Sequence, residues 1–163
     1  MTSEIDTSTD TPAQRRHLSA DIKRSLRELG IQLSLLNHHI GTRVDLHDVD
    51  LDCLDLIDSH GPLSPSTLVR RAGLHPATVT GVLDRLEKGG WVARERDPSD
   101  RRAVVVRSLR ARNPELMRLY SGMNTSMDQI CADYTATKLE VVADFLRRTA
   151  HAGRRATDEL AAE

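Results

Sequence analysis

Residues 63–109 read LSPSTLVRRAGLHPATVTGVLDRLEKGGWVARERDPSDRRAVVVRSL, and this stretch decides the fold. Ser64 followed by Pro65 is typical of a helix N-cap and a proline in the first turn, where its missing N–H costs nothing. The short helix that begins there is expected to end at Gly73, and Pro76 begins another helix after a tight turn. Two short helices joined by a turn that contains glycine predict a helix-turn-helix.

The pattern changes from helical to β-like after this second helix. Gly89 and Gly90 terminate the helix, and residues 103–106 (AVVV) are the strongest β-forming run in the chain. Residues 97–100 (DPSD) are a typical turn sequence, so residues 91–109 are predicted to form a hairpin with a charged tip. A hairpin that follows a helix-turn-helix directly predicts a winged domain.

Long amphipathic helices are predicted on both sides of this domain. Apolar residues recur every three or four positions over residues 18–40, and Gly41 is expected to end this helix. Another helix is expected over residues 46–59, and two long helices follow from Asn113, with a break at residues 135–137. The predicted fold class is mainly α with a small β-hairpin wing.

These elements divide the chain into four predicted segments. They are a disordered tail (1–13), an N-terminal dimerisation helix (14–45), the winged helix-turn-helix domain (46–110) and C-terminal dimerisation helices (111–163). The apolar stripes of the long helices need partners, and one copy of a chain this small cannot easily cover them. We therefore expect a homodimer, with an intramolecular helical bundle as the alternative.

The distribution of charge points to nucleic acid, although the net charge is only −1. Residues 61–112 carry eleven Lys and Arg against five Asp and Glu, which gives +6. The flanks are acidic, at −5 over residues 1–60 and −2 over residues 113–163. A basic segment between acidic flanks concentrates positive potential on one part of the fold, which favours double-stranded DNA as the partner. Chance clustering on a solvated surface is the alternative.

Composition and motifs argue against several other classes of protein. Apolar residues make up 39% and charged residues 29% of the chain, and no apolar run approaches the roughly 20 residues of a membrane span. The N-terminus lacks the features of a signal peptide, so we expect a cytoplasmic protein with reduced cysteines and no membrane partner. Without a Gly-rich phosphate loop, a nucleophile elbow or a zinc motif, we expect no cofactor and no enzymatic activity.

The second helix of the helix-turn-helix, over residues 76–88, is the candidate recognition helix. A B-form major groove is about 12 Å wide and admits one α-helix. Small side chains in the N-terminal half of this helix allow a close approach to base edges, and Arg85 suits a phosphate or a guanine. The N-terminus of the helix also offers free backbone N–H groups to phosphate.

The hairpin supplies a second set of contacts. Its arginines form a thin cationic loop that can enter the minor groove, where negative potential is enhanced. Asp97 and Asp100 are expected to stabilise the turn and orient the neighbouring arginines. The predicted DNA-binding residues are Ser64, His75, Pro76, Ala77, Thr78, Thr80, Gly81, Arg85, Arg94, Arg96, Arg101 and Arg102. A merely solvated hairpin, and a winged-helix protein-interaction module without DNA binding, are the alternatives.

The stretch 63–92, together with the hairpin residues 94–103, resembles the core of the MarR family of bacterial regulators. Asp100, Arg101 and Arg102 match the Asp-x-Arg pattern of the family's wing. The flanking helices agree in number and order, so the resemblance extends over nearly the whole chain.

This resemblance implies an obligate homodimer that binds a pseudo-palindromic operator, with half-sites about one helical turn apart. It implies that each recognition helix enters a major groove and that Arg102 (or Arg101) reaches the adjacent minor groove. Family members are usually repressors released by small anionic or phenolic ligands, which bind between the dimerisation helices and the winged domain. A small anionic or aromatic effector is therefore expected.

One residue departs from the family pattern. His75 stands just before Pro76, where family members commonly have Ser or Thr, and His is a weaker N-cap. We expect a plain turn residue at this position. A contact of the ring with phosphate and a mild pH dependence of DNA binding stay open as alternatives.

Metal or redox sensing on the same scaffold is a further alternative. Cys53 and Cys131 fall inside helical patterns and are expected to pack in the core rather than act as redox switches. A metal site would have to come from the group His38, His39, Asp45, His47 and Asp48. Adjacent histidines diverge by about 100° on a helix, so this group offers no clean chelate.

Overall fold

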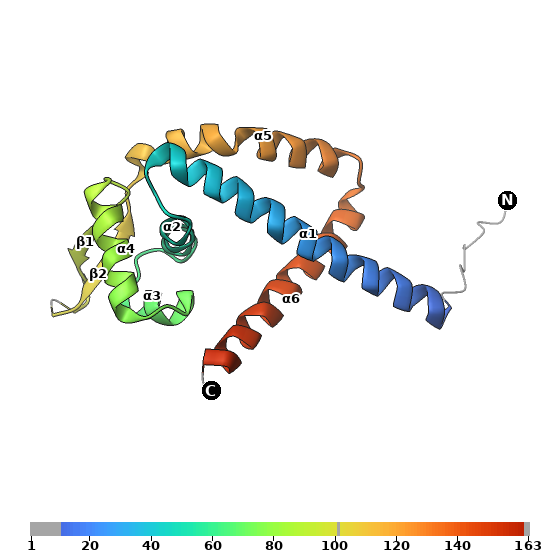
Figure 1. The fold of residues 1–163 in the computed structure, drawn as a ribbon, viewed down its shortest axis with the longest axis horizontal. Helices are drawn as coiled ribbons and strands as arrows, with labels where there is room; N and C mark the ends of the chain where they lie inside the picture. Colours follow the sequence, from blue (N-terminus) through green and yellow to red (C-terminus); the bar gives the residue numbers. More distant parts are fainter. Residues whose placement is uncertain (1–10, 101, 162–163) are drawn as a thin grey trace. The chain divides into compact units, whose positions relative to one another are not determined.

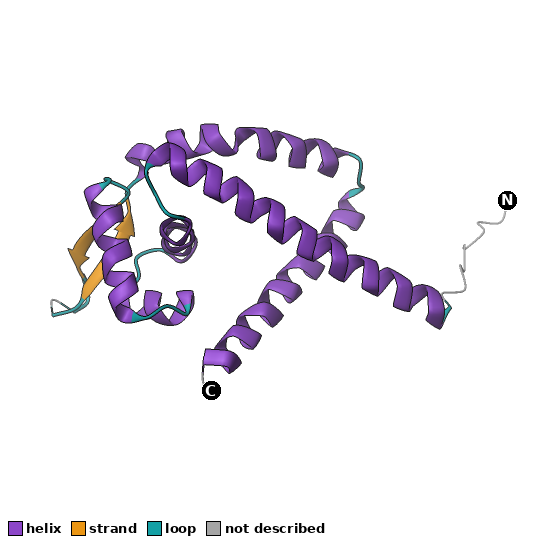
Figure 2. Cartoon of the chain, in the orientation of Figure 1, coloured by secondary structure: helices purple, strands orange, loops and turns teal. Residues whose placement is uncertain are grey.

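The computed structural model describes residues 11–100 and 102–161, which form helices and one two-stranded sheet (Figures 1 and 2). In chain order the elements are α1 (Pro12–Val44), α2 (Asp48–His60), α3 (Pro65–Ala72), α4 (Pro76–Lys88), β1 (Val92–Arg96), β2 (Val104–Ser108), the 3-10 helix η1 (Arg110–Arg112), α5 (Asn113–Ala132) and α6 (Ala136–Ala161). The chain divides into two compact units, the first ending at His39 and the second beginning at Ile40. The predicted fold class, mainly α with a hairpin wing, is confirmed.

A single apolar core joins α2, α3, α4 and the hairpin, and we call these elements (residues 48–108) the winged core. Helical spacing places four apolar residues of α4 on one buried face, and α2 buries a comparable stripe. The largest fully buried side chains of the winged core are Trp91, Ile57, Leu68, Leu83, Leu86, Val79, Val82, Val92 and Val106. Burial of each large aliphatic side chain contributes about 1.5–3 kcal/mol, so this core holds α4 firmly in place.

Capping residues close in sequence set both ends of α3, the first helix of the helix-turn-helix. The Ser64 side chain caps α3 by accepting a hydrogen bond from the Thr67 N–H at 3.1 Å. Gly73 ends α3 in the left-handed conformation, with φ 64°, and its N–H donates to the carbonyl oxygen of Val69 at 3.1 Å. The predicted limits of this helix are confirmed.

The wing is an antiparallel hairpin in which Val92 pairs with Ser108 and Arg96 with Val104. Leu63 adds a short third segment, because it exchanges backbone hydrogen bonds with Val106 at 3.0 and 2.7 Å. The segment before α3 is thereby fastened to β2, which connects the wing to the helix-turn-helix.

The aspartates of the hairpin turn stabilise it as predicted, whereas an orienting contact with the arginine side chains stays a prediction. Asp97 Oδ1 accepts hydrogen bonds from the Ser99 N–H at 2.7 Å and from the Ser99 hydroxyl at 2.6 Å. Asp100 Oδ1 accepts from the Arg102 N–H at 2.9 Å. Both carboxylates therefore hold the backbone of the tip in shape.

The first helix begins before the predicted segment 14–45 and passes through Gly41 without a break. A helix end is expected at Gly41, but α1 continues to Val44 and ends where Asp45 takes a φ of 58°. A β-carbon at Gly41 would lie 2.5 Å from the Leu46 carbonyl oxygen, so this glycine permits a close approach instead of a break. At the other end, the predicted tail (1–13) is too long because the helix begins at Pro12; residues 1–10 lie outside the described residues.

Helix α5 begins one residue earlier than the sequence predicts. Asn113 is predicted to cap it, but Asn113 is already helical and follows η1 directly. The cap position falls on Arg112, whose side chain makes no capping hydrogen bond. The Arg112 side chain is used elsewhere, as described below. No helix of residues 11–100 and 102–161 is both long and apolar enough to cross a membrane.

Candidate nucleic-acid interface

The N-terminal half of α4 presents short side chains to solvent. Val79 is buried and fixes the helix on the core, whereas Ala77, Thr78 and Thr80 are exposed. The Thr80 hydroxyl donates a hydrogen bond to the Pro76 carbonyl oxygen at 3.0 Å, so its proton is used within the helix. Short exposed side chains at a helix N-terminus are what a close approach to base edges and phosphates requires.

His75 caps α4 with its ring. Nδ1 accepts a hydrogen bond from the Ala77 N–H at 3.2 Å, so this nitrogen must carry no proton. The structure thus gives His75 a capping role where the sequence predicts a plain turn residue. Pro76 occupies the first turn, and Gly81 is half-buried further along the same helix. Contact of these residues, and of the α3 cap Ser64, with DNA stays a prediction.

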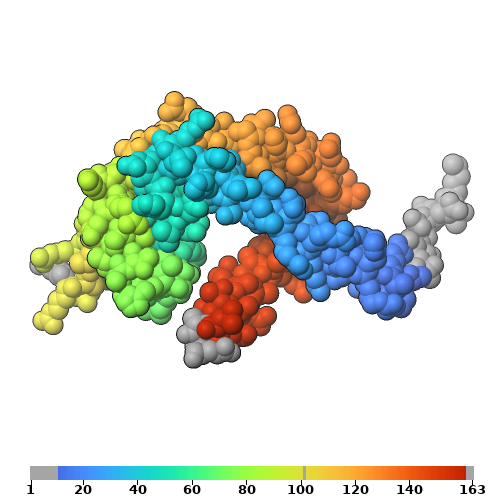
Figure 3. Space-filling view, in the orientation of Figure 1, coloured from blue at the N-terminus to red at the C-terminus, as the bar shows by residue number. Residues whose placement is uncertain are grey.

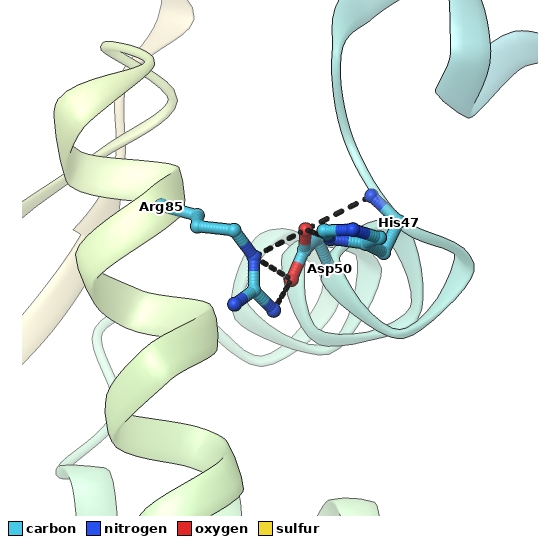
Figure 4. Close-up of polar contacts among 3 residues, drawn as sticks. All are labelled: His47, Asp50 and Arg85. Atoms are coloured by element: carbon cyan, nitrogen blue, oxygen red, sulfur yellow. Dashed lines mark hydrogen bonds and ion pairs between the residues drawn. The ribbon is translucent and has the colours of Figure 1, made fainter.

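Arg85 extends from the C-terminal half of α4 to a buried carboxylate on α2 (Figure 4). The side chain of Asp50 is 0% exposed, whereas that of Arg85 is 41% exposed. Nε of Arg85 lies 3.2 and 3.0 Å from the two carboxylate oxygens, and Nη2 donates to Oδ1 at 2.6 Å. The guanidinium therefore ties the recognition helix to α2, and any contact of Arg85 with DNA must use its exposed side.

His47 completes this network at the start of α2 (Figure 4). Its N–H donates to Asp50 Oδ2 at 2.9 Å, and its ring Nδ1 lies 3.1 Å from the same oxygen. Burial alone would raise the pKa of Asp50, but the hydrogen bonds from Arg85 and His47 outweigh burial and hold this pKa below its ordinary value of 3.8. Asp50 is therefore a charged, buried anchor at neutral pH.

Asp50 is not among the residues predicted from the sequence, although its spacing carries a signal for it. Asp50 precedes Cys53, Leu54 and Ile57 by three, four and seven positions, and all three are buried. This spacing places the aspartate on the apolar face of α2. A charge on such a face requires a partner, and the basic residue of α4 at position 85 supplies it.

Arg94 joins the wing to the recognition helix. Its Nη2 donates to Asp84 Oδ1 at 2.6 Å, and its Nη1 pairs with Glu87. The Arg94 N–H also donates to Glu87 Oε1 at 3.2 Å. Two carboxylates of α4 thus hold β1 through a single arginine, so Arg94 orients the wing whether or not it also contacts DNA.

The tip of the wing carries arginines of another kind. Figure 3 shows the hairpin, in yellow, projecting beyond the green α4. Arg96 and Arg102 are exposed, and no carboxylate of residues 11–100 and 102–161 pairs with either. Arg107, on the other strand, is held by Glu95 at 2.6 Å. Arg101 lies outside the described residues.

The cysteine predicted to pack in the core of the winged domain does so. Cys53 is 0% exposed, and burial together with the charges of Asp52 and Asp50 raises the pKa of its thiol to about 11. A thiol that stays protonated is a poor nucleophile, which disfavours redox sensing at this position. Cys131, on α5, is half-buried. Within the part of the chain that the structure describes, no group of three or more His, Cys, Asp or Glu is arranged to hold a metal ion.

A helix-turn-helix core, an exposed recognition helix and a basic hairpin define a winged helix-turn-helix DNA-binding protein. Comparison with known proteins agrees with this class: the MarR family model matches residues 46–104. YcgE of Bacillus subtilis, an HTH-type transcriptional regulator, is 33% identical over 140 residues, which span 86% of this chain and 91% of YcgE. The chain belongs to the MarR family of transcriptional regulators.

Two further relatives extend the comparison. The transcriptional regulator Tm0710 of Thermotoga maritima has a similar structure, with a TM-score of 0.60 and 25% identity over 84% of this chain and 96% of its own. NicR of Pseudomonas putida, an HTH-type transcriptional repressor, is 33% identical over 61 residues, which cover 37% of this chain and 39% of NicR. The similarity to Tm0710 therefore reaches well beyond the winged core.

Proposed function

We propose that this regulator is a repressor that binds a pseudo-palindromic operator as a homodimer and leaves it when a small anionic ligand binds. The observation that carries the DNA-binding part is the surface of α4 and the wing. Short exposed side chains at residues 77, 78 and 80 stand on the same core as Arg96 and Arg102, which pair with no carboxylate of the described residues. The first set suits a major groove and the second a minor groove.

The long helices support the dimer. On α1, Leu18, Ile22 and Leu29 are 51%, 42% and 41% exposed in the single chain, although their spacing forms one apolar stripe. Phe145 and Leu146 of α6 are 39% and 44% exposed. A second copy of the chain covers such stripes in the way that symmetric oligomers do, and two-fold symmetry then predicts two half-sites.

The test combines mass and DNA binding. Sedimentation of the purified chain is expected to give a dimer, and a mobility shift with the intergenic DNA beside its gene is expected to show one complex on an inverted repeat. The affinity should fall steeply with salt because phosphate contacts release counterions. A monomer, or a chain that retains no duplex DNA at low salt, would instead favour a winged-helix protein-interaction module.

The repressor role, suggested by NicR, is tested by the transcript level after deletion of the gene.

A cavity of about 590 Å³ supports an anionic effector. It lies between the end of α1, the turn that follows, the end of α4 and η1. Four of its lining residues are cationic, namely Arg43, Arg85, Lys88 and Arg112, and Asp45 also lines it. Arg85 and Arg112 are paired with Asp50 and Glu115, so Arg43 and Lys88 supply the positive charge that favours a carboxylate or phosphate ligand in a concave site.

The effector is tested with benzoate as the probe. Trp91 lines the cavity and is the only tryptophan of the chain, so its fluorescence should report binding. Arg43→Ala is expected to weaken the fluorescence change and the release of operator together. Arg118→Ala, which removes the same charge from α5 outside the cavity, is the matched control and should leave both unchanged.

A further inference from the structure

Trp91 is a buried anchor at which the recognition helix and the wing meet. The residue is 1% exposed. Its backbone N–H donates to the Leu86 carbonyl oxygen at 2.9 Å, and its backbone carbonyl oxygen accepts from the Leu109 N–H at 2.8 Å. A β-carbon at Gly89 would lie 2.7 Å from the indole Cδ1, so the indole fits because residue 89 has no side chain. Trp91 is therefore fixed to α4 and to the segment that leads into α5.

Arg112 joins this anchor to the first turn of α5. Its guanidinium carbon lies 3.9 Å from the centroid of the Trp91 ring, within the range of a cation–π contact. Nη1 donates to the Gly89 carbonyl oxygen at 2.8 Å, while Nε and Nη2 donate to Glu115 Oε2 at 2.9 and 2.8 Å. We call Trp91, Arg112 and Glu115 the latch, because one guanidinium links the end of α4 to α5.

Apolar packing alone does not fix the direction of α5. None of its residues, Asn113 to Ala132, is fully buried in the single chain, although Leu116, Leu119 and Tyr120 are half-buried. The direction in which α5 leaves the winged core therefore depends on these contacts together with η1 and the latch, in which the Arg112 side chain is 33% exposed. The contacts of Arg112 restrict the angle between α5 and α4, because a planar guanidinium with several donors tolerates little rotation.

We propose that Arg112 is a positioning residue for operator recognition. By holding α5 at a fixed angle to α4, it sets the distance between the two recognition helices of the dimer and thus the half-site spacing that the dimer accepts. This inference rests on the proposed function, because α5 belongs to the segment assigned to dimerisation. Two-fold symmetry repeats any change of angle in both copies, so a small local change alters the spacing twice.

The test uses the full chain and an operator selected by the purified protein from random DNA duplexes. The spacing between half-sites is lengthened and shortened by single base pairs, and the dissociation constant is measured for each duplex. The unchanged protein is expected to discriminate sharply among spacings. Arg112→Ala is expected to reduce this discrimination about fivefold. Binding to a duplex with one half-site should stay unchanged, because Arg112 is not placed on the DNA-facing surface.

Arg110→Ala is the matched control. Arg110 lies in the same 3-10 helix, is exposed, and loses the same charge on substitution, so the spacing preference should persist. Glu115→Gln keeps the arginine on the indole but removes the ion pair, so an intermediate loss of discrimination is expected. It also decides the matter if Arg112→Ala does not fold.

Two results overturn the positioning role of Arg112. The first is undiminished discrimination in Glu115→Gln and, where it folds, in Arg112→Ala. The second is a loss in Arg110→Ala equal to that in the latch variants. A different result, in which the unchanged protein selects no operator at all, overturns the proposed function itself. The two failures are therefore distinguishable, because the first leaves operator binding intact.

Discussion

The arginines that join α4 to its neighbours and those at the tip of the wing differ in a way that the charge count conceals. Arg85 and Arg94 each bind carboxylates on neighbouring elements, and both connect parts of the fold. Arg96 and Arg102 are exposed and meet no carboxylate within residues 11–100 and 102–161. The basic residues behind the net charge of +6 over residues 61–112 therefore include arginines that join parts of the fold and arginines that are exposed to solvent.

The paired arginines also differ in how deeply their carboxylate partners are buried. Asp50 is fully buried beneath Arg85, whereas Glu95 and Arg107 form their pair with side chains 46% and 45% exposed. Solvent screens an exposed pair, so it contributes little to stability, but a buried carboxylate deprived of its partner is costly. The comparison thus predicts effects on folding for the Arg85–Asp50 pair that joins α4 to α2, and effects on DNA binding at the tip of the wing.

The largest expected effect is on folding. Arg85→Ala should lower the free energy of unfolding by about 3 kcal/mol, because it leaves the buried Asp50 charge unpaired. Urea denaturation measures the change. Lys88→Ala, one turn further along α4 and exposed, is the matched control and should stay within about 0.5 kcal/mol of the unchanged protein. Equal stability of the two variants would show that the Asp50 pair does not hold α4.

Lowering the pH should reduce the free energy of unfolding less than Arg85→Ala does. Protonation of Asp50 removes its buried charge as well as its attraction to Arg85. The folded-state pKa of Asp50 lies below 3.8, so the pair's stabilisation is complete above the unfolded-state value and is lost as pH falls through the folded-state pKa. Asp50→Asn should lack this part of the acid sensitivity. The measurement is the urea midpoint from neutral pH down to about pH 3, compared between the two proteins. If the urea midpoints of the two proteins changed in parallel with pH, Asp50 would not be the source of this acid sensitivity, because the other carboxylates are the same in both proteins.

The limits of α3 and α4 could be predicted because each depends on neighbours in sequence. Ser64 with Pro65, and Gly73 with its positive φ, specify caps whatever lies elsewhere in the chain. Gly41 shows the limit of such signals. A glycine can end a helix or admit a close backbone, and only the position of the Leu46 carbonyl shows which applies.

The partners of the arginines could not be predicted from local pattern. Arg85 and Asp50 are 35 positions apart, and Arg112 and Gly89 are 23 apart. Net charge gives no distance between charges, so it cannot separate an arginine that contacts a buried carboxylate from one that reaches solvent. The helical spacing of Asp50 with buried apolar residues indicates that it needs a partner, but not which arginine supplies it.

At the tip of the wing, the expected effect is on DNA binding alone. Arg102→Ala should weaken operator binding about tenfold and reduce the salt slope by about one, with unfolding unchanged. Arg107→Ala removes the same charge from the same hairpin, but its guanidinium is already held by Glu95, so its effect should be smaller. Binding measured over a range of salt concentrations compares the two. An equal loss in both variants would mean that only the total charge of the wing matters.

The smallest expected effect separates two threonines of the recognition helix. The Thr80 hydroxyl already donates to the Pro76 carbonyl, whereas no side-chain hydrogen bond engages Thr78 within the described residues. Thr78→Val, which keeps the shape and removes the hydroxyl, should therefore change relative base preference about threefold, and Thr80→Val should change it less. Competition between single-base operator variants measures this preference. A stronger effect at position 80 would mean that the Thr80 hydroxyl exchanges its hydrogen bond to the Pro76 carbonyl for one to DNA. The hydrogen bond seen in the free protein would then not be kept in the complex.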